Sequence, residues 1–402
     1  MAVAKLNYSA LFFGLCISVS SLLLQGCGDD KNASNNNQPN TPDQVAPDTD
    51  QPAGQQVGSL RLIGEYIIPT KTMFNAVEFG GISGIDRDAD GSYWAVSDDR
   101  GGERGAPRFY KLDINLDADK IHHVNIKQMH YLRDQEQNFL PANRRTVDPE
   151  SIRVAPNGNL YISSEGIFSN QASALYQPFI REYSKTGHFV REFVIPKMFN
   201  YVDNASTGAR NNKVFESLTV TPKGMLFAAT EDALIQDGPI SSLKAGSVLR
   251  VLKLDPQTGQ STAQYAYQLP PIPVDALGQR FAPDNGLSEM LALSEHEFIA
   301  VERAFADGVG NTIRLVKTQI SPSTTDISQI DSLINAHYEP MSKSVLLDMP
   351  IHYAGIKLDN IEGITWGPRL KNGHRSLILV ADNNFLDQQS TQFIAFEVLP
   401  TR

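Results

Sequence analysis

Apolar and polar residues alternate in short runs along most of the chain after residue 57, and five stretches share one scheme. In each stretch, an alternating run is followed by a turn and by a second apolar run that ends in an acid. The clearest copies run from Glu150 to Glu165 and from Glu216 to Glu231. Alternation with a period of two, bounded by Gly, Pro or Asn, is typical of β-strands. The five copies begin at Ser83, Glu150, Glu216, Glu289 and Glu362.

The spacing of these copies predicts the fold class. Successive starts lie 67 (83 to 150), 66 (150 to 216), 73 (216 to 289) and 73 (289 to 362) residues apart. A regular period of strand pairs is typical of a β-propeller. We therefore predict an all-β, five-bladed propeller over residues 58–402. Six blades are the alternative, because the 73-residue intervals have room for a further strand pair.

The last repeat predicts how the ring closes. The second and third repeats each contain four strand-like runs, whereas the fifth contains only three, at 361–366, 376–381 and 392–398. The run at 60–69 stands alone before the first repeat. Added to the last blade, it would supply the fourth strand and remove the exposed sheet edges.

The first 57 residues differ in composition from the rest. Residues 1–26 have a weakly basic start and an apolar run that is short for a bilayer, and Leu24-Gln25-Gly26-Cys27 follows. This pattern resembles a lipoprotein signal, in which Cys27 is lipidated after cleavage; an ordinary secretory signal is the alternative. Residues 28–57 are rich in Asn, Asp, Gln and Pro, which is typical of a disordered tether. We predict an envelope lipoprotein, in the outer membrane because Gly28 follows the cysteine, with its domain in the periplasm or at the surface.

Charge and cysteine content narrow the range of partners. The formal net charge of −10 argues against a nucleic-acid partner. The two cysteines, Cys16 and Cys27, both precede the predicted propeller, so that domain can form no disulfide. We expect a monomer that contacts a membrane only through its lipid anchor.

Acidic residues recur at two positions of each repeat that the fold would bring together. In a four-stranded blade, the start of the innermost strand and the end of the second strand lie at the same face, so the repeated acids should surround one mouth of the central channel. The predicted catalytic acids, at the first position, are Glu150, Glu216, Glu289 and Glu362. The predicted metal ligands, at the second position and in one preceding loop, are Asp98, Glu165, Glu231, Glu302, Asp359 and Asp382.

So many carboxylates need compensating positive charge. One source is a bound hard cation, most simply Ca²⁺, which prefers carboxylate and carbonyl oxygens. The other is a set of basic residues near the same loops, which would also bind an anionic substrate: Arg145, Arg210, Arg280, Arg303 and Lys357. A third interpretation is structural, since repeated acids in propellers can cap neighbouring blades. The segment Asp86–Gly91 matches the first half of a calcium loop, but Ser97 stands where that motif needs Glu, which favours a plain turn.

Several short motifs then carry a resemblance. Gly80-Gly-Ile-Ser-Gly-Ile85, Trp94-Ala-Val-Ser-Asp-Asp-Arg100, Asn285-Gly-Leu-Ser-Glu289 and Asp359-Asn-Ile-Glu-Gly-Ile-Thr365 resemble the bacterial phytase-like family, described as having esterase-like activity of phytase. The resemblance covers about residues 58–399. Propeller phytases are similar in architecture and hold phosphate with calcium at an acidic mouth, so the resemblance implies similar chemistry. Their specific motif run does not occur here, so their catalytic residues are not carried over.

The leading hypothesis is thus a calcium-assisted hydrolase of a phosphate or carboxylic ester, with a small anionic ester as substrate. Metal would polarise the ester and activate water, and an unligated carboxylate would act as general base. There is no G-x-S-x-G elbow, P-loop or H-E-x-x-H motif, which leaves two alternatives open. One is a non-catalytic module that binds an envelope glycan or protein, and the other is a calcium-dependent lactonase.

Overall fold

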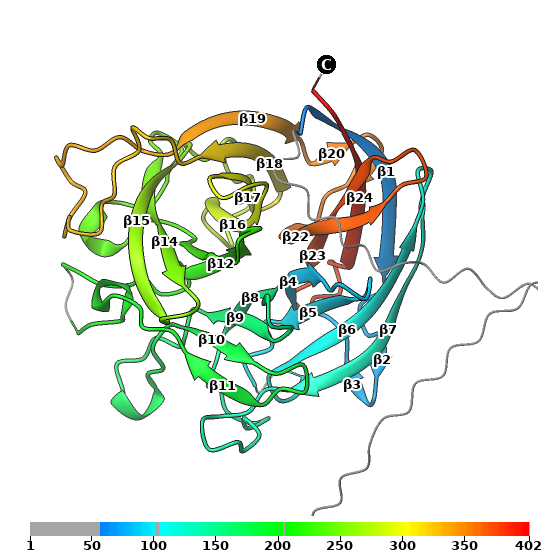
Figure 1. The fold of residues 1–402 in the computed structure, drawn as a ribbon, viewed down its shortest axis with the longest axis horizontal. Helices are drawn as coiled ribbons and strands as arrows, with labels where there is room; N and C mark the ends of the chain where they lie inside the picture. The colour runs from blue at the N-terminus through cyan, green and yellow to red at the C-terminus, as the bar shows by residue number, and fades with distance from the viewer. Residues whose placement is uncertain (1–56, 102–103, 204–205, 402) are drawn as a thin grey trace, which may run out of the picture. The chain divides into compact units, whose positions relative to one another are not determined.

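Five four-stranded antiparallel sheets form a ring, so the predicted five-bladed β-propeller is confirmed (Figure 1). The computed structural model describes residues 57–101, 104–203 and 206–401. The predicted signal, Cys27 and the predicted tether lie outside these ranges, apart from Val57. No helix in the described ranges is long and apolar enough to cross a membrane.

Each blade runs from an inner strand at the axis to an outer strand at the edge (Figure 1). Blade 1 contains β4 (Ile82–Arg87), β5 (Tyr93–Ser97), β6 (Arg108–Leu116) and β7 (Ile121–Tyr131). Blade 2 contains β8 (Pro149–Val154), β9 (Leu160–Ser164), β10 (Phe179–Tyr183) and β11 (Phe189–Glu192). Blade 3 contains β12 (Phe215–Val220), β13 (Leu226–Thr230), β14 (Ser247–Asp255) and β15 (Gln260–Leu269). Blade 4 contains β16 (Asp284–Ala292), β17 (Glu297–Ala306), β18 (Gly310–Gln319) and β19 (Ser342–Met349).

Blade 5 combines the two ends of the described chain. It contains β22 (Asn360–Arg369), β23 (Arg375–Asp382) and β24 (Thr391–Leu399), and its outer strand is β1 (Ser59–Ile68). The pairing of β1 with β24 extends from Ser59 opposite Leu399 to Ile68 opposite Thr391. The N-terminal strand therefore closes the ring as the sequence predicts.

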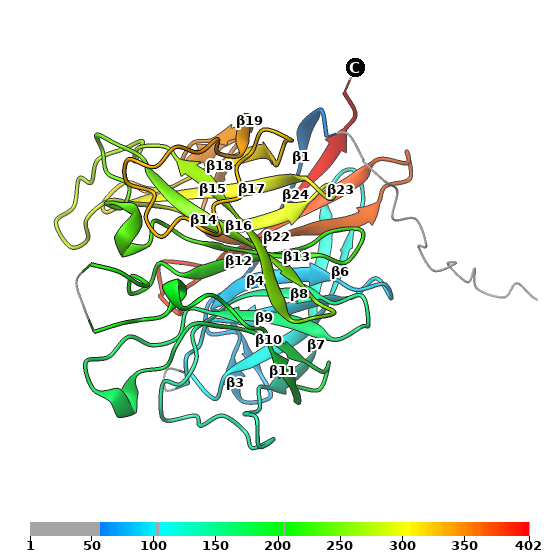
Figure 2. The ribbon, with the colours of Figure 1, turned by 60° about the vertical axis from the view of Figure 1, so that its left-hand side comes forward.

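The remaining elements lie in the connections between strands. Two small hairpins, β2 (Met73–Phe74) with β3 (Val77–Glu78) and β20 (His352–Tyr353) with β21 (Ile356–Lys357), precede the inner strands of blades 1 and 5. Three single-turn 3₁₀ helices lie at Ala172–Ala174, Lys197–Phe199 and Ile235–Asp237. Their connections fold at the ends of the blades, as the rotated view shows (Figure 2).

Most apolar cores lie between neighbouring blades. Side chains of β4, β5 and β6 pack with those of β23 and β24, so Ile85, Tyr110 and Phe393 are fully buried in one cluster between blades 1 and 5. A second cluster joins blades 2 and 3 through Tyr161, Phe215 and Leu252. Both faces of each blade are thus covered, and all five residues of the second strands β9 and β13 are buried.

The hairpin between the two inner strands is built alike in the first three blades. Gly91, Gly158 and Gly224 occupy the same place in this turn, with φ of 84°, 84° and 85°. In each, the glycine N–H donates to the backbone carbonyl three residues earlier, at 2.8–3.0 Å. This left-handed conformation favours glycine, and it turns the chain so that the second strand returns to the face where the first began.

Candidate functional site

Every inner strand carries a β-bulge near its start, and the bulge sets which side chain faces the channel mouth. The register of the two inner strands shifts at Ser83, at Glu150–Ser151, at Glu216, at Ser288 and at Glu362. A bulged residue is left out of the ladder and its side chain is re-aimed. Three of the five bulges therefore present a glutamate, at positions 150, 216 and 362.

The register of the second strand of each blade shows which residue follows that strand at the channel mouth, which is the second position where acids recur. Ser97, Ser164 and Thr230 face equivalent residues at the start of their inner strands, and the next residue is acidic in each blade. In blade 4 the equivalent residue is Glu302, which faces Leu287, so the next residue is Arg303. The ring position is thus occupied by Asp98, Glu165, Glu231, Arg303 and Asp382 in blades 1 to 5.

Two of the predicted mouth acids are therefore displaced by one residue. The prediction pairs Glu289 with Glu302, but Glu289 faces Val301, and the bulge places Ser288 at the ring position. Because side chains alternate along a strand, a shift of one residue moves a side chain to the other face. Glu289 lies deeper on the axis and Glu302 lies outside the ring, and neither joins the other acids.

The carboxyl groups that do gather form what we call the acid ring. They interact electrostatically with one another and are at least half-buried. The acid ring consists of Asp98, Asp148, Glu150, Glu165, Glu216, Glu231, Asp284, Glu362 and Asp382.

In the described part of the chain, Arg303, Lys213 and Arg100 contact this ring, and of these Arg303 is one of the predicted substrate-binding residues. Arg303 donates to Glu231 Oε1 at 2.9 Å and to Glu362 Oε1 at 2.6 Å. Lys213 Nζ lies 2.8 Å from Glu231 Oε2 and 2.5 Å from Asp284 Oδ2. Arg100 lies 2.6 Å from Asp148 Oδ1. Nine carboxyls against three cations leave an excess of negative charge if all are ionised.

The other predicted substrate-binding cations do not converge on the ring. Arg210 clamps a loop by donating to the carbonyls of Ala233 and Gly238. Arg280 is exposed and stacks on Phe281, and the side chains of Arg145 and Lys357 are exposed. The predicted metal ligand Asp359 accepts hydrogen bonds from Gln389 and Ser390 and orders that loop.

The excess negative charge and the burial raise the pKa values of several of these acids. Burial, reinforced by the negative charge of Glu216, raises the pKa of Glu150 well above its ordinary value. Burial and the charges of Asp382 and Glu231 raise the pKa of Glu362 to about 8, although Arg303 opposes the shift. Burial raises the pKa of Asp382 to about 6, against the hydrogen bond from the Asn384 N–H. Glu362 therefore holds a proton at neutral pH unless a bound cation replaces it, and the raised pKa values of Glu150 and Asp382 favour the protonated form in the same way.

Two overlapping triads of carboxylates have the geometry of a cation site. One contains Asp148, Glu150 and Glu165, and the other contains Glu165, Glu216 and Glu231; within each, one oxygen per residue lies within 4.8 Å of the others. Glu165, which belongs to both, accepts a hydrogen bond from the Val214 N–H at Oε1. Its Oε2 is buried and has no hydrogen-bond partner in the described part of the chain. A set of oxygen donors with an unsatisfied buried carboxylate fits a hard cation such as Ca²⁺.

The partial calcium-loop motif has a different arrangement. Asp88 accepts from Trp94 Nε1 at 2.9 Å and from Lys185, and Asp90 pairs with Lys111 at 2.8 Å. Asp86 accepts hydrogen bonds from the Val154 N–H and the Thr365 hydroxyl. The three carboxylates are thus each held by protein donors around a turn.

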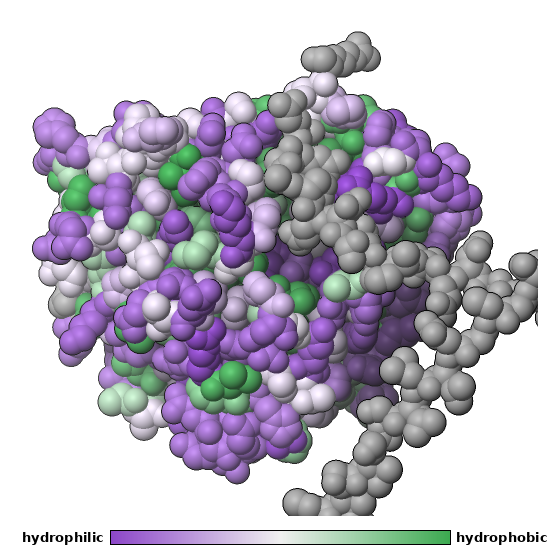
Figure 3. Space-filling view, viewed as in Figure 1, coloured by the Kyte–Doolittle hydropathy of each residue, from purple (hydrophilic) through white to green (hydrophobic). Residues whose placement is uncertain are grey.

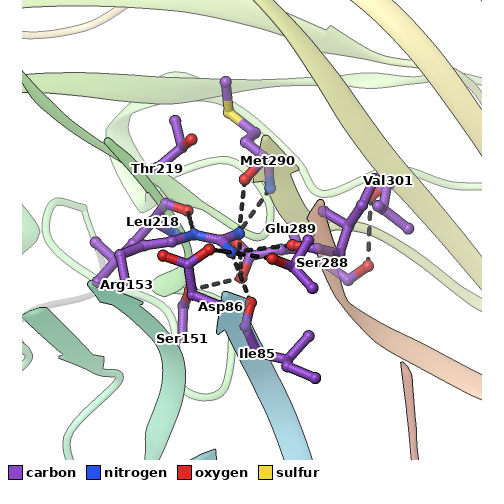
Figure 4. A network of polar contacts seen from close by, with 12 residues as sticks. Ile85, Asp86, Ser151, Arg153, Leu218, Thr219, Ser288, Glu289, Met290 and Val301 are labelled. Carbon is purple, nitrogen blue, oxygen red and sulfur yellow. Dashed lines mark hydrogen bonds and ion pairs between the residues drawn. The ribbon is translucent and has the colours of Figure 1, made fainter. Parts of the chain in front are cut away.

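A buried arginine, which the sequence reasoning missed, lies deeper on the axis (Figure 4). Arg153, from blade 2, donates to the carbonyls of Leu218 at 2.6 Å, Ile85 at 2.7 Å, Met290 at 2.8 Å and Ile364 at 2.9 Å. These carbonyls come from equivalent positions of the other four blades.

Glu289 completes this axial arginine site. Its Oε2 lies 2.9 Å from Arg153 and accepts a hydrogen bond from the Ser151 hydroxyl at 2.6 Å. Burial raises the pKa of Glu289 to about 7, although Arg153 opposes the shift. The only signal in the sequence was a basic residue at an inner-strand position that is uncharged or acidic in the other four repeats.

Fold and site together define the class of the protein: a five-bladed propeller with a carboxylate-rich mouth. The chain belongs to the phytase-like family, whose description is esterase-like activity of phytase, and the match covers residues 77–385. A comparison with curated proteins found no relative.

The solved structures that match this chain are only distantly similar to it. A protein of unknown function from Dyadobacter fermentans aligns with 86% of this chain and 100% of its own, at 10% identity and a TM-score of 0.40. Streptogramin B lyase aligns over 83% of this chain and 98% of its own, at 11% identity and a TM-score of 0.34. Neither likeness bears on activity.

Proposed function

We propose that this protein is a calcium-dependent ester hydrolase that acts at the acid ring. The observation that carries the proposal is the buried Glu165 carboxylate, which is shared by two triads and has an unsatisfied oxygen. An uncompensated carboxylate in a protein interior is costly. Such an arrangement is favourable when a cation occupies it.

The residues that would hold Ca²⁺ are those of the two triads. Asp148, Glu150, Glu216 and Glu231 provide further carboxylate oxygens around Glu165. When bound, the cation supplies Lewis acidity towards an ester oxygen and makes a coordinated water more acidic. The high pKa values of Glu150, Glu165 and Glu216 mean that cation binding displaces protons, so binding strengthens as pH rises.

Glu362 is the best candidate for the general base. It belongs to neither triad, and Arg303 and Asn360 both donate to its Oε1, which fixes the carboxyl in place. Its pKa of about 8 is close to neutral. A base is most effective when its pKa lies near the operating pH. Glu362 would accept the proton of the attacking water, and Arg303 would hold the carboxyl towards the ring.

The surface around the mouth favours a carboxylic ester with apolar groups over a highly charged phosphate ester. Of the fifteen large apolar side chains exposed in the described ranges, eleven lie in connections at the end of the blades where the acid ring is. Phe168, which is 44% exposed, packs edge-on against Tyr201 with 5.4 Å between ring centres. Tyr201 in turn lies near Glu165 and Asp148, whose charges contribute to its raised pKa. The predicted arginine clamp for an anion does not gather there.

The deciding experiment measures calcium content and ester turnover on the same purified samples. We expect calcium to co-purify, and we expect a chelator to abolish hydrolysis of aryl and alkyl carboxylic esters. Glu165→Gln should lose calcium, whereas Glu362→Gln should keep calcium and lose turnover. Glu182→Gln is the matched control, because Glu182 is also buried but is bonded to Asn157, Asn159 and Arg191, outside the mouth.

Two other outcomes would redirect the proposal. Calcium binding without turnover of any ester would favour a binding module for an envelope glycan or protein. A marked preference for cyclic esters would identify the lactonase, which the exposed apolar side chains around the mouth also suit. If the protein binds no calcium and hydrolyses the esters equally well with a chelator present, the proposed role of the acid ring is wrong.

We also propose that the protein is attached to the outer membrane through a lipid on Cys27 and acts there as a monomer. The support is the sequence Leu24-Gln25-Gly26-Cys27 and the polar stretch that follows. Cys27→Ser should move the protein from the membrane fraction to the soluble fraction, and continued membrane attachment of this variant would contradict the proposal.

A further inference from the structure

A separate cavity of about 240 Å³ lies on the side of blade 4, outside the acid ring. Its polar wall comes from β17, β18 and β19, and its apolar wall comes mainly from prolines 270, 271 and 273 in the β15–β16 connection. Glu302 lines this cavity, whereas the next residue, Arg303, points into the acid ring. Strand β17 therefore separates the two sites.

Two opposite charges in this cavity are neighbours that do not pair with each other. Glu302 and Arg314 are directly opposite on β17 and β18. Glu302 Oε1 instead accepts from the Tyr267 hydroxyl at 2.6 Å and from Lys343. Arg314 Nε instead donates to Asp348 at 2.6 Å. Glu302 and Arg314 are thus each bonded to other residues, and both line the cavity.

This arrangement leaves one acceptor and two donor groups without a partner. Glu302 is 3% exposed, yet its Oε2 has no hydrogen-bond partner in the described ranges. Arg314 bonds through Nε to Asp348, and its two terminal nitrogens make no hydrogen bond among the described residues. A buried carboxylate oxygen needs a donor, and a guanidinium with free terminal nitrogens matches a carboxylate.

We propose that this cavity binds a free α-amino acid with an apolar side chain. The ammonium group would donate to Glu302 Oε2, and the carboxylate would accept from the terminal nitrogens of Arg314. Directly opposed residues of an antiparallel pair have Cβ atoms about 5 Å apart. The side chains of Glu302 and Arg314 can therefore reach the ammonium and the carboxylate of one amino acid, since both are attached to its α-carbon. The prolines and Met349 provide an apolar wall for the side chain. The volume corresponds to roughly eight waters, which suits a ligand of this size.

The test is calorimetric titration of the purified protein with the L-amino acids, and L-leucine is the first probe. N-acetyl-L-leucine lacks the ammonium charge and L-leucinamide lacks the carboxylate, so each should bind at least about tenfold more weakly. Glu302→Gln and Arg314→Met should each weaken leucine binding by about tenfold or more. Arg314→Met is informative even if the buried Glu302 variant fails to fold, because the Arg314 side chain is 35% exposed.

Arg181→Met is the matched control. Arg181 and Glu192 are also cross-strand partners, on β10 and β11, but they pair directly at 2.7 Å and leave no gap. The variant should bind leucine as the parent does. The proposal is overturned if no amino acid binds at about 10 mM, which would mean that water alone fills the cavity. It is also overturned if the two single-charge analogues bind as tightly as leucine.

Discussion

The acid ring and the axial arginine site lie on the same axis, yet they balance charge in opposite ways. At the axial site, the five N–H donors of one guanidinium meet four carbonyls and Glu289, so every donor has an acceptor. In the acid ring, nine carboxyls meet three cations among the described residues, and Glu165 keeps an oxygen without a partner there. Figure 3 shows one end of the propeller, where hydrophilic side chains predominate on the surface.

The difference separates a structural polar centre from a functional one. A buried polar network is stabilising when every member is satisfied and costly when one is not. The axial arginine joins all five blades, so its contacts account for its burial without a ligand. The contacts within the acid ring do not satisfy all of its carboxylates, which is why we assign the Ca²⁺ site to it.

The largest expected effect comes from breaking the axial site. Arg153→Met should lower the free energy of unfolding by about 3–5 kcal/mol, because it leaves four buried carbonyls and Glu289 without their cation. Chemical denaturation measures this loss. Arg369→Met, which removes an exposed hydrogen bond to Gly373, is the control and should change little. An equal change in stability in both variants would mean that the axial contacts contribute no more than an exposed hydrogen bond.

Calcium should affect the acid ring and leave the axial site unchanged. At a calcium concentration of about a hundred times the dissociation constant, the free energy of unfolding should rise by about 2.7 kcal/mol. Thermal unfolding with calcium and with a chelator measures this. Glu165→Gln should lose most of the calcium effect. An undiminished effect in that variant would place the cation elsewhere.

Without calcium, the acid ring should make stability depend on pH. The pKa values of Asp382, about 6, and Glu362, about 8, are raised above those of the unfolded chain. The stability they contribute is therefore complete below the unfolded pKa near 4 and is lost as pH rises through 6 and 8. We expect a fall on the order of 2 kcal/mol between about pH 5 and 8 in the chelated protein.

Denaturation across this pH range checks the sign of the effect. Glu289, with its pKa of about 7, contributes in the same direction, so the comparison needs a variant of the ring alone. Glu362→Gln should flatten the profile in the upper half of the range. Stability that rises with pH in the chelated parent would contradict the proposed protonation of the ring.

The smallest effect should come from loosening the axial site without removing its charge. Ser151→Ala deletes the 2.6 Å hydrogen bond to Glu289 but leaves the Arg153–Glu289 pair. Hydrogen bonds to charged groups contribute about 1.5–3 kcal/mol, so we expect a loss near the lower value, measured by chemical denaturation. Retention of full stability would mean that Arg153 alone fixes Glu289.

Much of the fold could be predicted because it repeats. The predicted runs at 361–366, 376–381 and 392–398 fall within β22, β23 and β24. The isolated run at 60–69 differs from β1 by one residue at each end. Alternation and turn residues are local properties, and five copies of one pattern reinforce one another.

The candidate site could be predicted only in the blades with a regular register. Glu150, Glu165, Glu216, Glu231, Glu362, Asp98 and Asp382 all join the acid ring, as do the loop acids Asp148 and Asp284. In blade 4, however, aligning glutamate with glutamate selects Glu289 and Glu302 and misses Ser288 and Arg303. One bulge decides this register, and the sequence of blade 4 does not distinguish the two alignments.

The sequence by itself determined the all-β class, the five repeats, the closing strand and the accumulation of acids at one face, since each follows from local patterns and their period. Only the tertiary structure decided which charges meet. Lys213, from the loop before blade 3, reaches Asp284 of blade 4, and Arg153 donates to carbonyls of four other blades. Such contacts depend on the register and on closure of the ring, because they join residues that are far apart along the chain.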